Sequence, residues 1–268
     1  MMKYKLIAVD LDGTLLNDES DMTERTKFAI IKAVDAGALF VTATGRAIQG
    51  AEFVNEQLSK DMPFIVFNGA SVIMGKSRKI LFSKFLDKAL AKEAYDMGAS
   101  RATPMVIWTD AGLRVSYDSK GTAEYKEYYK KYYYSNQKVI DDIDELEDER
   151  IYKIIWFGKR DIILKYQHEM NSHFAERVNC HTSLPEYLEF VSPDADKGAA
   201  MEEIGKVYGI DRSEMIAVGD GYNDISMIKY AGLGVAMGNA PGDVKAACDL
   251  VTLSNNHDGV AAVIEEYF

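Results

Sequence analysis

The sequence predicts an α/β protein with a mostly parallel sheet and a separate α+β domain inserted into it. Short apolar runs alternate with segments of helical periodicity over the first hundred residues, and the same alternation returns near the C-terminus. This alternation is typical of βαβ units, in which a helix connects two parallel strands. The stretch between the two parts is rich in tyrosine and acidic residues. That change in composition indicates a module with a fold of its own.

The first strand is expected at the short apolar run Leu6–Val9. A helix is expected from Thr23 to Ala36, because Thr23 is a good N-cap residue and Gly37 is a frequent helix stop. Within it, apolar residues recur at helical spacing: Phe28, Ile30, Ile31 and Val34. The run Leu39–Val41 then predicts a second strand.

A helical stretch follows from about Ala47 to Leu58, and a third β-rich run, Phe64–Phe67, ends in the turn-like pair Asn68-Gly69. Near the C-terminus, a helix with apolar residues Met201, Ile204, Val207 and Tyr208 precedes three more strand-like runs. These runs are Met215–Val218, Leu233–Ala236 and Leu250–Leu253. They match the strands of the first part in character, so both parts are expected to form one core.

The middle of the chain predicts the inserted domain. Tyr125–Tyr134 holds six of the 16 tyrosines and favours an amphipathic element, whereas Asp141–Glu149 holds seven carboxylates in nine positions and favours a solvated linker or helix face. Strands are expected at Tyr152–Phe157 and Tyr187–Val191. Between them a helix is expected behind Asp161 as N-cap. Its apolar stripe consists of Ile162, Tyr166, Met170 and Phe174.

The 268 residues suffice for one large domain or two small ones. We expect a core from residues 1–83 and 191–268, with the inserted domain at residues 84–190. The composition, 47% hydrophobic and 27% charged, is that of a soluble globular protein. The two cysteines, Cys180 and Cys248, have no C-x-x-C spacing, which excludes a disulfide framework and a thiolate zinc site.

Charge and hydropathy exclude several partners. Lysine and arginine number 31 against 42 acidic residues, so the net charge is −11. This charge repels nucleic-acid phosphates, and no basic cluster offsets it. No apolar run approaches the ~18 residues of a membrane span, and Asp10 ends the N-terminal apolar run too early for a signal peptide. A cytoplasmic protein is expected, and the sequence does not indicate its oligomeric state.

The segment Asp10–Thr14 (DLDGT) places two carboxylates at the carboxyl end of the first strand. In an extended chain, residues i and i+2 point to the same side, so Asp10 and Asp12 can face one crevice, and Gly13 lets the backbone turn immediately afterwards. Paired carboxylates at a strand end favour a functional site. The alternative is an Asx-rich turn, since Asp, Gly and Thr are common in turns.

The segment Thr44–Arg46 (TGR), just past the second strand, is a candidate phosphate-binding loop. A hydroxyl followed by the free amides of a glycine-containing loop can bind phosphate oxygens, and an opening helix would add its positive end. The alternative is that Thr44 is only a helix N-cap.

Two further segments carry candidate ligands. Lys197 opens a helix, where its charge opposes the macrodipole, and a bound anion would resolve that conflict, although an isolated lysine is most often solvated surface. Gly219–Asp224 (GDGYND) follows the strand Met215–Val218, at the end where ligands of open α/β sheets bind, unless it is merely a loop of Asx turns. Together the segments supply the carboxylates, hydroxyl and ammonium that Mg²⁺ and a phosphoryl group require.

In their order along the chain, these segments resemble the four motifs of the haloacid dehalogenase (HAD) superfamily. The matching segments are Asp10–Thr14, Thr44–Arg46, Lys197-Gly198 and Gly219–Asp224. Nearly the whole chain resembles one branch, the Cof-type phosphatases, including the stretches Phe67–Ala70, Tyr187–Val191 and Val235–Ala240. No motif residue departs from the family pattern. The resemblance implies a Rossmann-like core of the HAD fold with a large α/β cap of type C2 inserted between the second and third motifs.

The resemblance also implies a reaction through an aspartyl-phosphate. Asp10 is the expected nucleophile, and Asp12 is the expected general acid and base. Mg²⁺ is the expected cofactor, held by the Asp10 carboxylate, the Asp12 backbone carbonyl and Asp220. Asp224 is expected behind these ligands, acting through water or Lys197.

Other residues are expected around the substrate. The resemblance implies that the phosphoryl oxygens are stabilised by Thr44, Gly45, Lys197, Asn223 and the backbone amides of Leu11 and Asp12. Thr14 is expected to brace the loop. Arg46 and Asn68 are candidate substrate or cap contacts, and each could equally be structural.

The predicted function is a Mg²⁺-dependent phosphomonoesterase for small phosphorylated metabolites, with sugar phosphates favoured. A small phosphate ester is the expected partner, with neither nucleic acid nor membrane. The cap is expected to exclude water and select the leaving group. Two alternatives stay open: a phosphotransferase or phosphomutase that uses the same aspartate nucleophile, and a non-enzymatic sensor of a phosphorylated ligand.

Overall fold

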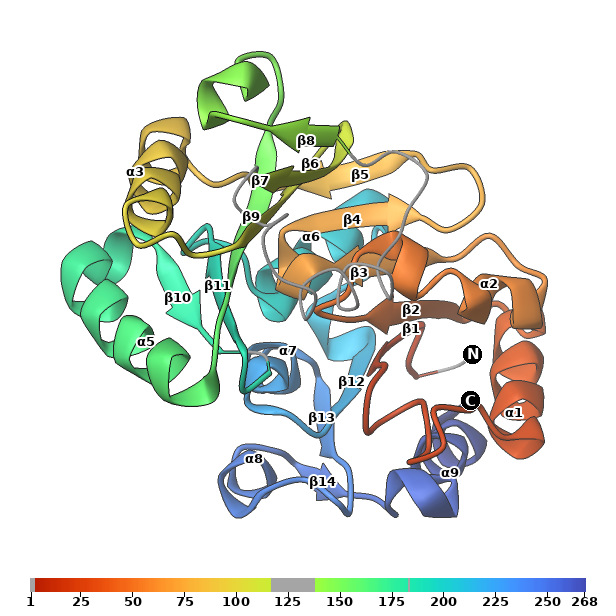
Figure 1. Cartoon of the computed structure of the whole chain (residues 1–268). Coiled ribbons are helices and arrows are strands. Elements are labelled where there is room, and N and C mark those ends of the chain that lie inside the picture. Colours follow the sequence, from red (N-terminus) through yellow and green to blue (C-terminus); the bar gives the residue numbers. More distant parts are fainter. Residues whose placement is uncertain (1–2, 117–137, 183) are drawn as a thin grey trace. The chain divides into compact units, whose positions relative to one another are not determined.

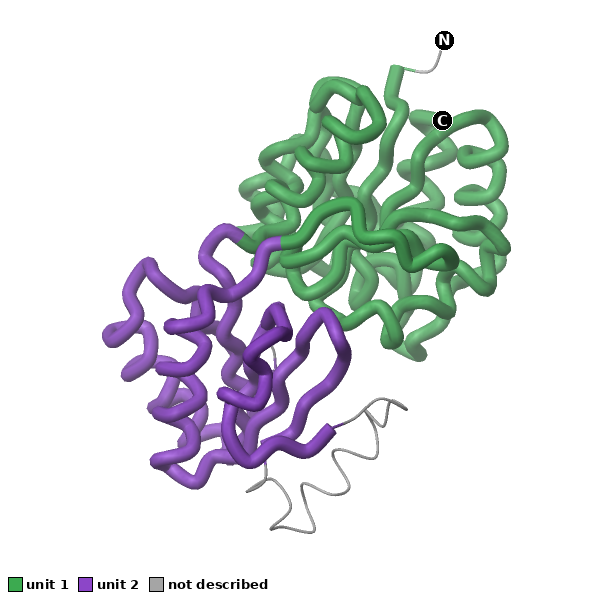
Figure 2. The backbone as a smooth tube through the Cα atoms, turned by 90° about the horizontal axis from the view of Figure 1, so that it is seen from above, with its two compact units in different colours: residues 1–83, 195–268 green, residues 84–194 purple. Residues whose placement is uncertain are grey.

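The computed structural model describes residues 3–116, 138–182 and 184–268. The chain divides into two compact units (Figure 2). Unit 1 comprises residues 1–83 and 195–268, and unit 2 comprises residues 84–194. The sequence placed the second boundary after residue 190. Each unit has its own sheet and its own hydrophobic core.

Unit 1 contains a sheet whose strands, within the described residues, follow the order β14-β13-β12-β1-β2-β3-β4-β5 (Figure 1). The strands are β1 (Leu6–Asp10), β2 (Leu39–Ala43), β3 (Pro63–Val66), β4 (Ser71–Met74), β5 (Ile80–Ser83), β12 (Met215–Gly219), β13 (Leu233–Ala236) and β14 (Leu250–Val251). Neighbours from β14 to β3 pair in parallel, whereas β4 and β5 form an antiparallel edge. The predicted α/β class with a mostly parallel core sheet is confirmed.

Helices connect these strands. The α-helices of unit 1 are α1 (Glu24–Asp35), α2 (Phe53–Leu58), α6 (Lys197–Tyr208), α7 (Ile225–Tyr230), α8 (Gly242–Ala246) and α9 (Gly259–Tyr267). Thr23 caps α1 by accepting a hydrogen bond from the Thr26 amide at 3.2 Å. Gly37, just past the helix, has a φ of +105°, which glycine adopts without strain. The expected apolar stripe is wrong at Phe28, which is 70% exposed, whereas Ile30 is fully buried.

Two expected elements of unit 1 differ from the structure. The helix expected from Ala47 to Leu58 is broken: a 3₁₀ turn covers Ile48–Gly50, and α2 begins only at Phe53. The glycine at position 50 disfavours a continuous α-helix here. The third strand ends at Val66, because the next two residues have positive φ angles of 52° and 56° and the chain reverses into the antiparallel β4.

The register of the sheet determines where its polar residues gather. β1 lies between β2 and β12, and Ala8 faces Val41 on one side and Ala217 on the other. These three strands are almost completely buried, which explains their apolar sequences. Because these strands run parallel, the segments that follow them meet at one side of the sheet, where the carboxyl-terminal ends of the strands lie. We call this side the carboxyl edge.

Unit 2 has a sheet with the order β10-β11-β9-β6-β7-β8 within the described residues. Its elements are α3 (Lys88–Ala99), β6 (Met105–Thr109), β7 (Gly112–Ser116), β8 (Lys138–Ile140), β9 (Ile151–Phe157), α5 (Arg160–Phe174), β10 (Asn179–His181) and β11 (Tyr187–Val191). Most neighbours pair antiparallel, and β7 with β8 pairs in parallel. Trp156 centres the core, with its ring 4.7 Å from Phe190. Within the described residues, a mostly antiparallel sheet accompanied by α3 and α5 agrees with the expected α+β class.

The expected start of α5 is wrong by two residues. α5 begins at Arg160 behind Lys159, and Asp161 lies in its first turn, where a negative charge favours the helix dipole without capping it. The apolar stripe is also displaced, because Ile162 is 40% exposed and Ile163 is buried in its place.

The acidic segment Asp141–Glu149 is more ordered than a solvated linker. Residues 143–146 form a 3₁₀ helix, and Asp142 caps it by accepting from the Asp144 amide at 2.9 Å. Glu149 pairs with Arg114 at 2.7 Å. The expected amphipathic element at Tyr125–Tyr134 lies outside the described residues.

The helices are short relative to a bilayer. α5 has 15 residues. Within the described ranges, no helix joins the length and the apolar character that crossing a membrane requires.

Candidate active site

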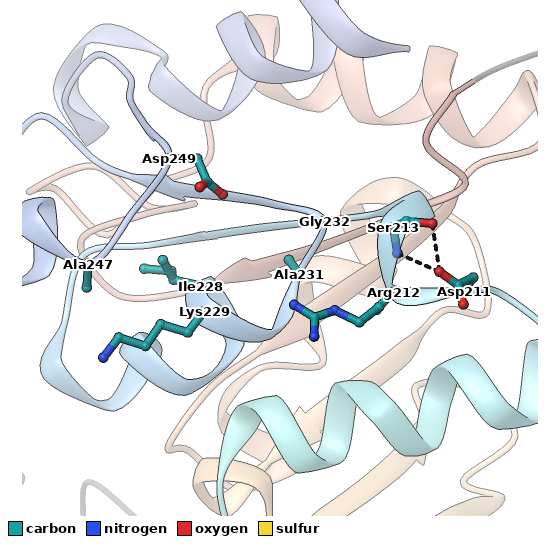
Figure 3. Close-up of a pocket in the computed structure, with 9 residues that line it drawn as sticks. All are labelled: Asp211, Arg212, Ser213, Ile228, Lys229, Ala231, Gly232, Ala247 and Asp249. Atoms are coloured by element: carbon teal, nitrogen blue, oxygen red, sulfur yellow. Dashed lines mark hydrogen bonds between the residues drawn. The ribbon is translucent and has the colours of Figure 1, made fainter.

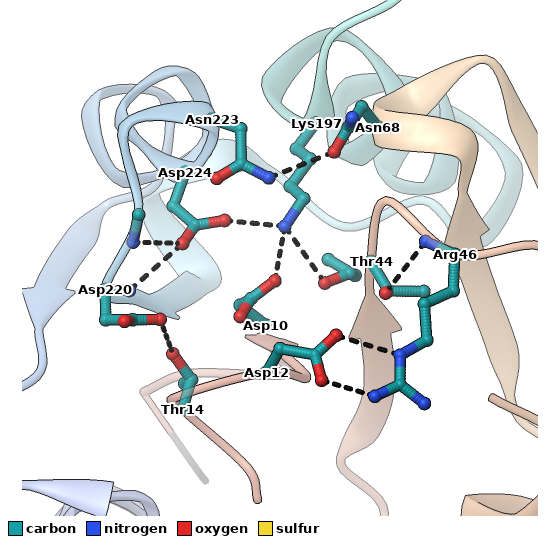
Figure 4. Close-up of polar contacts among 12 residues, drawn as sticks. Asp10, Asp12, Thr14, Thr44, Arg46, Asn68, Lys197, Asp220, Asn223 and Asp224 are labelled. Carbon is teal, nitrogen blue, oxygen red and sulfur yellow. Dashed lines mark hydrogen bonds and ion pairs between the residues drawn. The ribbon is translucent and has the colours of Figure 1, made fainter. Parts of the chain in front are cut away.

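Polar side chains from distant parts of the sequence converge at the carboxyl edge of unit 1 (Figure 4). Asp10 is the last residue of β1, Thr44 follows β2, and Asp220 follows β12. Lys197 is the first residue of α6, whose N-cap Asp196 accepts from the Ala199 amide. The fold therefore brings members of all four sequence motifs to one edge.

The ammonium group of Lys197 is the centre of this site. Its side chain is fully buried, and Nζ donates to Asp10 Oδ1 at 2.5 Å, Asp224 Oδ1 at 2.6 Å and the Ala43 carbonyl at 3.1 Å. These three acceptors use all three N–H bonds of the ammonium. The alternative of a solvated surface lysine is therefore wrong, and two carboxylates of the protein supply the anions that a cation at a helix N-terminus needs.

Burial and charge shift the ionisation of these groups. Burial raises the pKa of Asp10 well above its ordinary value, and the charge of Asp224 raises it further, whereas Lys197 lowers it. Burial alone would lower the pKa of Lys197, but the charges of Asp10 and Asp224 outweigh it and raise that pKa. Burial, aided by the charge of Asp224, also raises the pKa of Asp220. Lys197 thus stays cationic, while the carboxyl groups of Asp10 and Asp220 resist ionisation.

Three carboxylates form an acidic cluster at this edge. Asp10, Asp220 and Asp224 each offer an oxygen atom, and these atoms lie within 4.8 Å of one another. Asp224 also fixes its own loop, because its Oδ2 accepts from the amides of Asp220 at 3.0 Å and Gly221 at 2.8 Å. One ammonium does not balance three carboxylates. Hard oxygen donors with surplus negative charge suit a divalent cation.

The carboxylate of Asp220 is held from two sides. Thr14 Oγ1 donates to its Oδ1 at 2.9 Å, and Asn239 Nδ2 donates to its Oδ2 at 3.3 Å and to the Gly13 carbonyl at 2.8 Å. Gly13 has a φ of +78°, and a Cβ atom there would lie 2.6 Å from Asp220 Oδ2. Only glycine fits this close approach. The loop after β1 and the loop after β12 are therefore fastened together.

Asn239 lies in the family-like stretch Val235–Ala240, but it is outside the four motifs and no role is expected for it from the sequence. Its Oδ1 accepts from the Asn255 amide at 3.0 Å, and Asn255 Nδ2 donates to the Leu16 carbonyl at 3.2 Å. The signal that could have found it is its place: it follows β13, the parallel neighbour of β12, at the same carboxyl edge.

Asp12 does not continue the extended geometry of Asp10. β1 ends at Asp10, and Leu11, whose side chain is fully buried, begins a turn that the Leu16 amide closes by donating to the Leu11 carbonyl. The Asp12 side chain is 57% exposed and turns toward Arg46 (Figure 4). Arg46 Nε donates to its Oδ2 at 2.9 Å and Nη2 to its Oδ1 at 2.5 Å. The strand geometry assumed for the two carboxylates is therefore wrong.

No helix opens at Thr44. Thr44 is 1% exposed, its amide donates to the Ile65 carbonyl at 2.8 Å, and its hydroxyl accepts from the Arg46 amide at 3.1 Å. The next helical turn begins at Ile48 and has no side-chain cap. Both the helix-dipole contribution and the N-cap role expected here are wrong. The hydroxyl instead stabilises a tight loop of its own.

Asn68 and Asn223 meet beside this loop. Asn223 Nδ2 donates to Asn68 Oδ1 at 3.0 Å. Asn68 has φ and ψ of 56° and 30°, the left-handed region that asparagine tolerates better than most residues. A Cβ atom on Gly45 would lie 2.9 Å from Asn68 Oδ1, so a larger residue at position 45 would require the Asn68 side chain to move.

A cavity of about 770 Å³ lies at the opposite edge of the same sheet (Figure 3). The residues that line it include those just before β12, β13 and β14. Its cations Arg212 and Lys229 are exposed, and its Asp249 accepts from the Gly234 amide at 2.8 Å. Buried charge is concentrated at the carboxyl edge instead, which makes that edge the candidate active site.

Residues 7–264 match the profile of the haloacid dehalogenase-like hydrolases. The chain belongs to this family. The match runs through both units and through the segments Asp10–Thr14, Thr44–Arg46, Lys197-Gly198 and Gly219–Asp224, so the resemblance expected from these segments is confirmed.

Relatives of this HAD protein are named as phosphatases. It is 30% identical to the 5-amino-6-(5-phospho-D-ribitylamino)uracil phosphatase YwtE of Bacillus subtilis, over 98% of this chain and 97% of the relative. The identically named phosphatase YbjI of Escherichia coli is 29% identical, over 99% of this chain and 96% of the relative. The expected phosphomonoesterase class is confirmed.

Solved structures share the whole fold. A haloacid dehalogenase-like hydrolase from Bacteroides thetaiotaomicron is 30% identical, with a TM-score of 0.84 over 99% of this chain and 100% of the other. TM0651 from Thermotoga maritima is 28% identical, with a TM-score of 0.86 over 98% of this chain and 97% of the other. The expected HAD fold with a cap domain is confirmed.

Proposed function

We propose that this phosphatase hydrolyses small phosphorylated metabolites, sugar phosphates foremost, with Mg²⁺ and through an aspartyl-phosphate on Asp10. The observation that carries the proposal is the buried cluster in which Lys197 holds Asp10 beside Asp220 and Asp224. The substrate class is supported by relatives named for a phosphate ester of a ribityl chain, which is a polyol close in chemistry to a sugar. The cytoplasmic location stays a prediction.

The donor set suits Mg²⁺. Asp10 and Asp220 would hold the ion together with the Asp12 backbone carbonyl, and Asp224 would fix the loop that carries Asp220. When bound, Mg²⁺ offsets the repulsion between the Asp10 carboxylate and a phosphate ester.

In the first half-reaction, Asp10 attacks phosphorus. Lys197 holds the Asp10 carboxylate in place, and one of its oxygens forms the new O–P bond while the bond to the leaving oxygen breaks. Asp12 gives a proton to that leaving oxygen. Lys197 favours the ionised nucleophile that burial alone would disfavour.

In the second half-reaction, water attacks the phosphorus of the aspartyl-phosphate. Asp12 now takes a proton from the water, inorganic phosphate leaves, and the Asp10 carboxylate is restored. Two aspartates with different surroundings therefore have different tasks. Asp10 is 6% exposed and bonded to an ammonium, whereas the Asp12 side chain reaches solvent.

Donors at the carboxyl edge would stabilise the phosphoryl oxygens. Thr44 Oγ1 accepts from the Arg46 amide and so retains its own proton for donation. Lys197, whose three N–H bonds are already used, would contribute its positive charge. The amide of Gly45 and the side-chain amide of Asn223 would add donors, as would the backbone amides of Leu11 and Asp12.

The test is a panel of sugar phosphates, polyol phosphates and p-nitrophenyl phosphate, assayed for inorganic phosphate with Mg²⁺ and with chelator. Asp10→Asn should lower turnover by at least ~10³-fold with the fold intact. Appreciable remaining activity would contradict the nucleophile assignment. Phosphosugar products instead of inorganic phosphate would favour a phosphotransferase, and tight binding without any phosphate release would favour a sensor.

A further inference from the structure

The guanidinium of Arg46 is fixed at the rim of the active site. Its Nη1 donates to the Gly50 carbonyl at 2.8 Å, and its own backbone amide donates to Thr44 Oγ1 at 3.1 Å. The remaining donors form a two-point contact with Asp12, at 2.9 Å from Nε and 2.5 Å from Nη2. Arg46 is thus held by the loop after β2 and presents a flat pair of donors to the loop after β1.

The carboxylate of Asp12 depends on this contact. Within the described residues, Arg46 is the one side chain that hydrogen-bonds it, and the Asp12 side chain is 57% exposed. The backbone of Asp12 forms an isolated β-bridge with Leu16, whereas Arg46 contacts its side chain. An exposed aspartate without a fixed partner samples several rotamers, each of which places the carboxyl group elsewhere.

We propose that Arg46 is the positioning residue of the acid–base step, an inference that rests on the proposed function. Its guanidinium gives one N–H to each oxygen of Asp12, and each oxygen keeps a second lone pair. Asp12 can therefore give its proton to the leaving oxygen, and later take one from water, while Arg46 fixes its orientation. Arg46 itself neither gives nor takes a proton and forms no bond to phosphorus.

This role predicts a dependence on the leaving group. p-Nitrophenolate departs from phosphorus as a stable anion and needs little proton transfer, whereas the alkoxide of benzyl phosphate is strongly basic and needs it fully. The two esters are similar in size, so both fit one site. A residue that positions the acid should matter for benzyl phosphate and hardly for p-nitrophenyl phosphate.

The experiment measures kcat/KM for both esters with Mg²⁺, because this constant reports the step that forms the aspartyl-phosphate. Arg46→Ala should lower it ~30-fold for benzyl phosphate and less than ~3-fold for p-nitrophenyl phosphate. Arg46→Lys, which donates from one point, should fall between wild type and Arg46→Ala for benzyl phosphate. In an Asp12→Asn background, Arg46→Ala should cause no further loss, because the residue it positions no longer serves as an acid.

The matched control is Arg25→Ala. Arg25 forms an exposed two-point pair with Glu265 in the same unit, at 3.1 and 2.7 Å. The Arg25→Ala substitution should leave kcat/KM unchanged for both esters. Equal losses on both esters after Arg46→Ala, or no loss on either, would overturn the positioning role even if Asp10→Asn abolishes turnover. If wild type hydrolyses neither ester, the proposed function falls together with this inference. Should Arg46→Ala fail to fold by circular dichroism, Arg46→Lys decides by the same comparison.

Discussion

The two units each bury a lysine against carboxylates, but the charge balance differs. In unit 2, Lys153 on β9 meets Glu189 on β11 at 3.0 Å, and both side chains are at most 6% exposed. In unit 1, Lys197 meets both Asp10 and Asp224, and a third carboxylate lies within 4.8 Å. The first cluster joins Lys153 to Glu189, which also lies 3.7 Å from His181 Nε2, whereas the second carries surplus negative charge.

The contacts of Lys153 suit a structural role, whereas those of Lys197 suit a functional one. Removing charges from water is costly in both places, and a matched pair recovers much of that cost through its own attraction. Surplus carboxylates do not recover it, which is why the pKa values of Asp10 and Asp220 rise. Such an arrangement is kept for what it binds rather than for stability. Unit 1 therefore contains the site that a cation and a phosphoryl group would complete.

The largest expected effect comes from removing the buried ammonium group of Lys197 in unit 1. Lys197→Met leaves the buried carboxylates of Asp10 and Asp224 without a cation, which should cost about 3–5 kcal/mol of folding free energy and abolish phosphate release. Lys153→Met removes the ammonium that Glu189 contacts at 3.0 Å and should also lower the folding free energy, but at low temperature it should retain turnover of p-nitrophenyl phosphate. Thermal unfolding and phosphate release on both variants test this. An active Lys197→Met variant would remove the distinction between the clusters.

A smaller effect is expected from loosening Asp220. Asn239→Ala removes the donor to Asp220 Oδ2 and should weaken metal binding about 10-fold, as losses around metal ligands commonly do. Titration calorimetry with Mg²⁺ measures this independently of turnover. Asn256→Ala is the control, because Asn256 bonds Asp18 at 2.8 Å in the same C-terminal region. Equal affinities for wild type and Asn239→Ala would show that Asn239 has no role toward the metal.

The surplus charge predicts a stabilising substitution. Because the folded-state pKa of Asp10 is raised, the folded protein binds more protons than the unfolded chain between about pH 3.9 and that raised value, and stability falls as pH rises through this window. With chelator at neutral pH, Asp10→Asn should raise Tm by about 2–4 °C. The gain should disappear near pH 4. A lower Tm at neutral pH would mean that the Asp10 carboxylate stabilises the fold.

The smallest effect is expected in unit 2. Replacing the pair together, by Lys153→Met with Glu189→Leu, removes both charges and leaves neither unpaired. Such swaps of buried pairs are commonly close to neutral, so stability should change by less than about 2 kcal/mol. Differential scanning calorimetry of the double variant beside Lys153→Met alone checks this. If the double variant is as unstable as Lys153→Met alone, Lys153 and Glu189 do more for the fold than neutralise each other.

The sequence predicts most of the core because its signals are local. Buried parallel strands such as Leu6–Asp10 and Met215–Gly219 are continuous apolar runs, and the Thr23 cap and Gly37 stop mark the ends of α1. Boundaries without such signals were placed wrongly: Lys159 rather than Asp161 precedes α5. A cap depends on backbone torsions that the residue type alone does not set.

The site shows where local signals end. Motif spacing placed Asp10 and Lys197 at element ends, and the fold places them in contact across 187 positions. Residues i and i+2 point to the same side only in an extended chain. This rule could not predict the orientation of Asp12, because β1 ends two residues earlier, at Asp10. Asn239 lies in no catalytic motif, and only the parallel pairing of β13 with β12 brings it to Asp220. These contacts depend on tertiary structure.

The most direct test of the central claim is to trap the covalent intermediate. The protein with Mg²⁺ is mixed with p-nitrophenyl phosphate, quenched in acid within one turnover and reduced with borohydride, which converts an aspartyl-phosphate to homoserine. Peptide mass spectrometry should find homoserine at position 10 and nowhere else, and no homoserine in Asp10→Asn. Phosphate release without homoserine at position 10, or with the modification at another aspartate, would contradict the account.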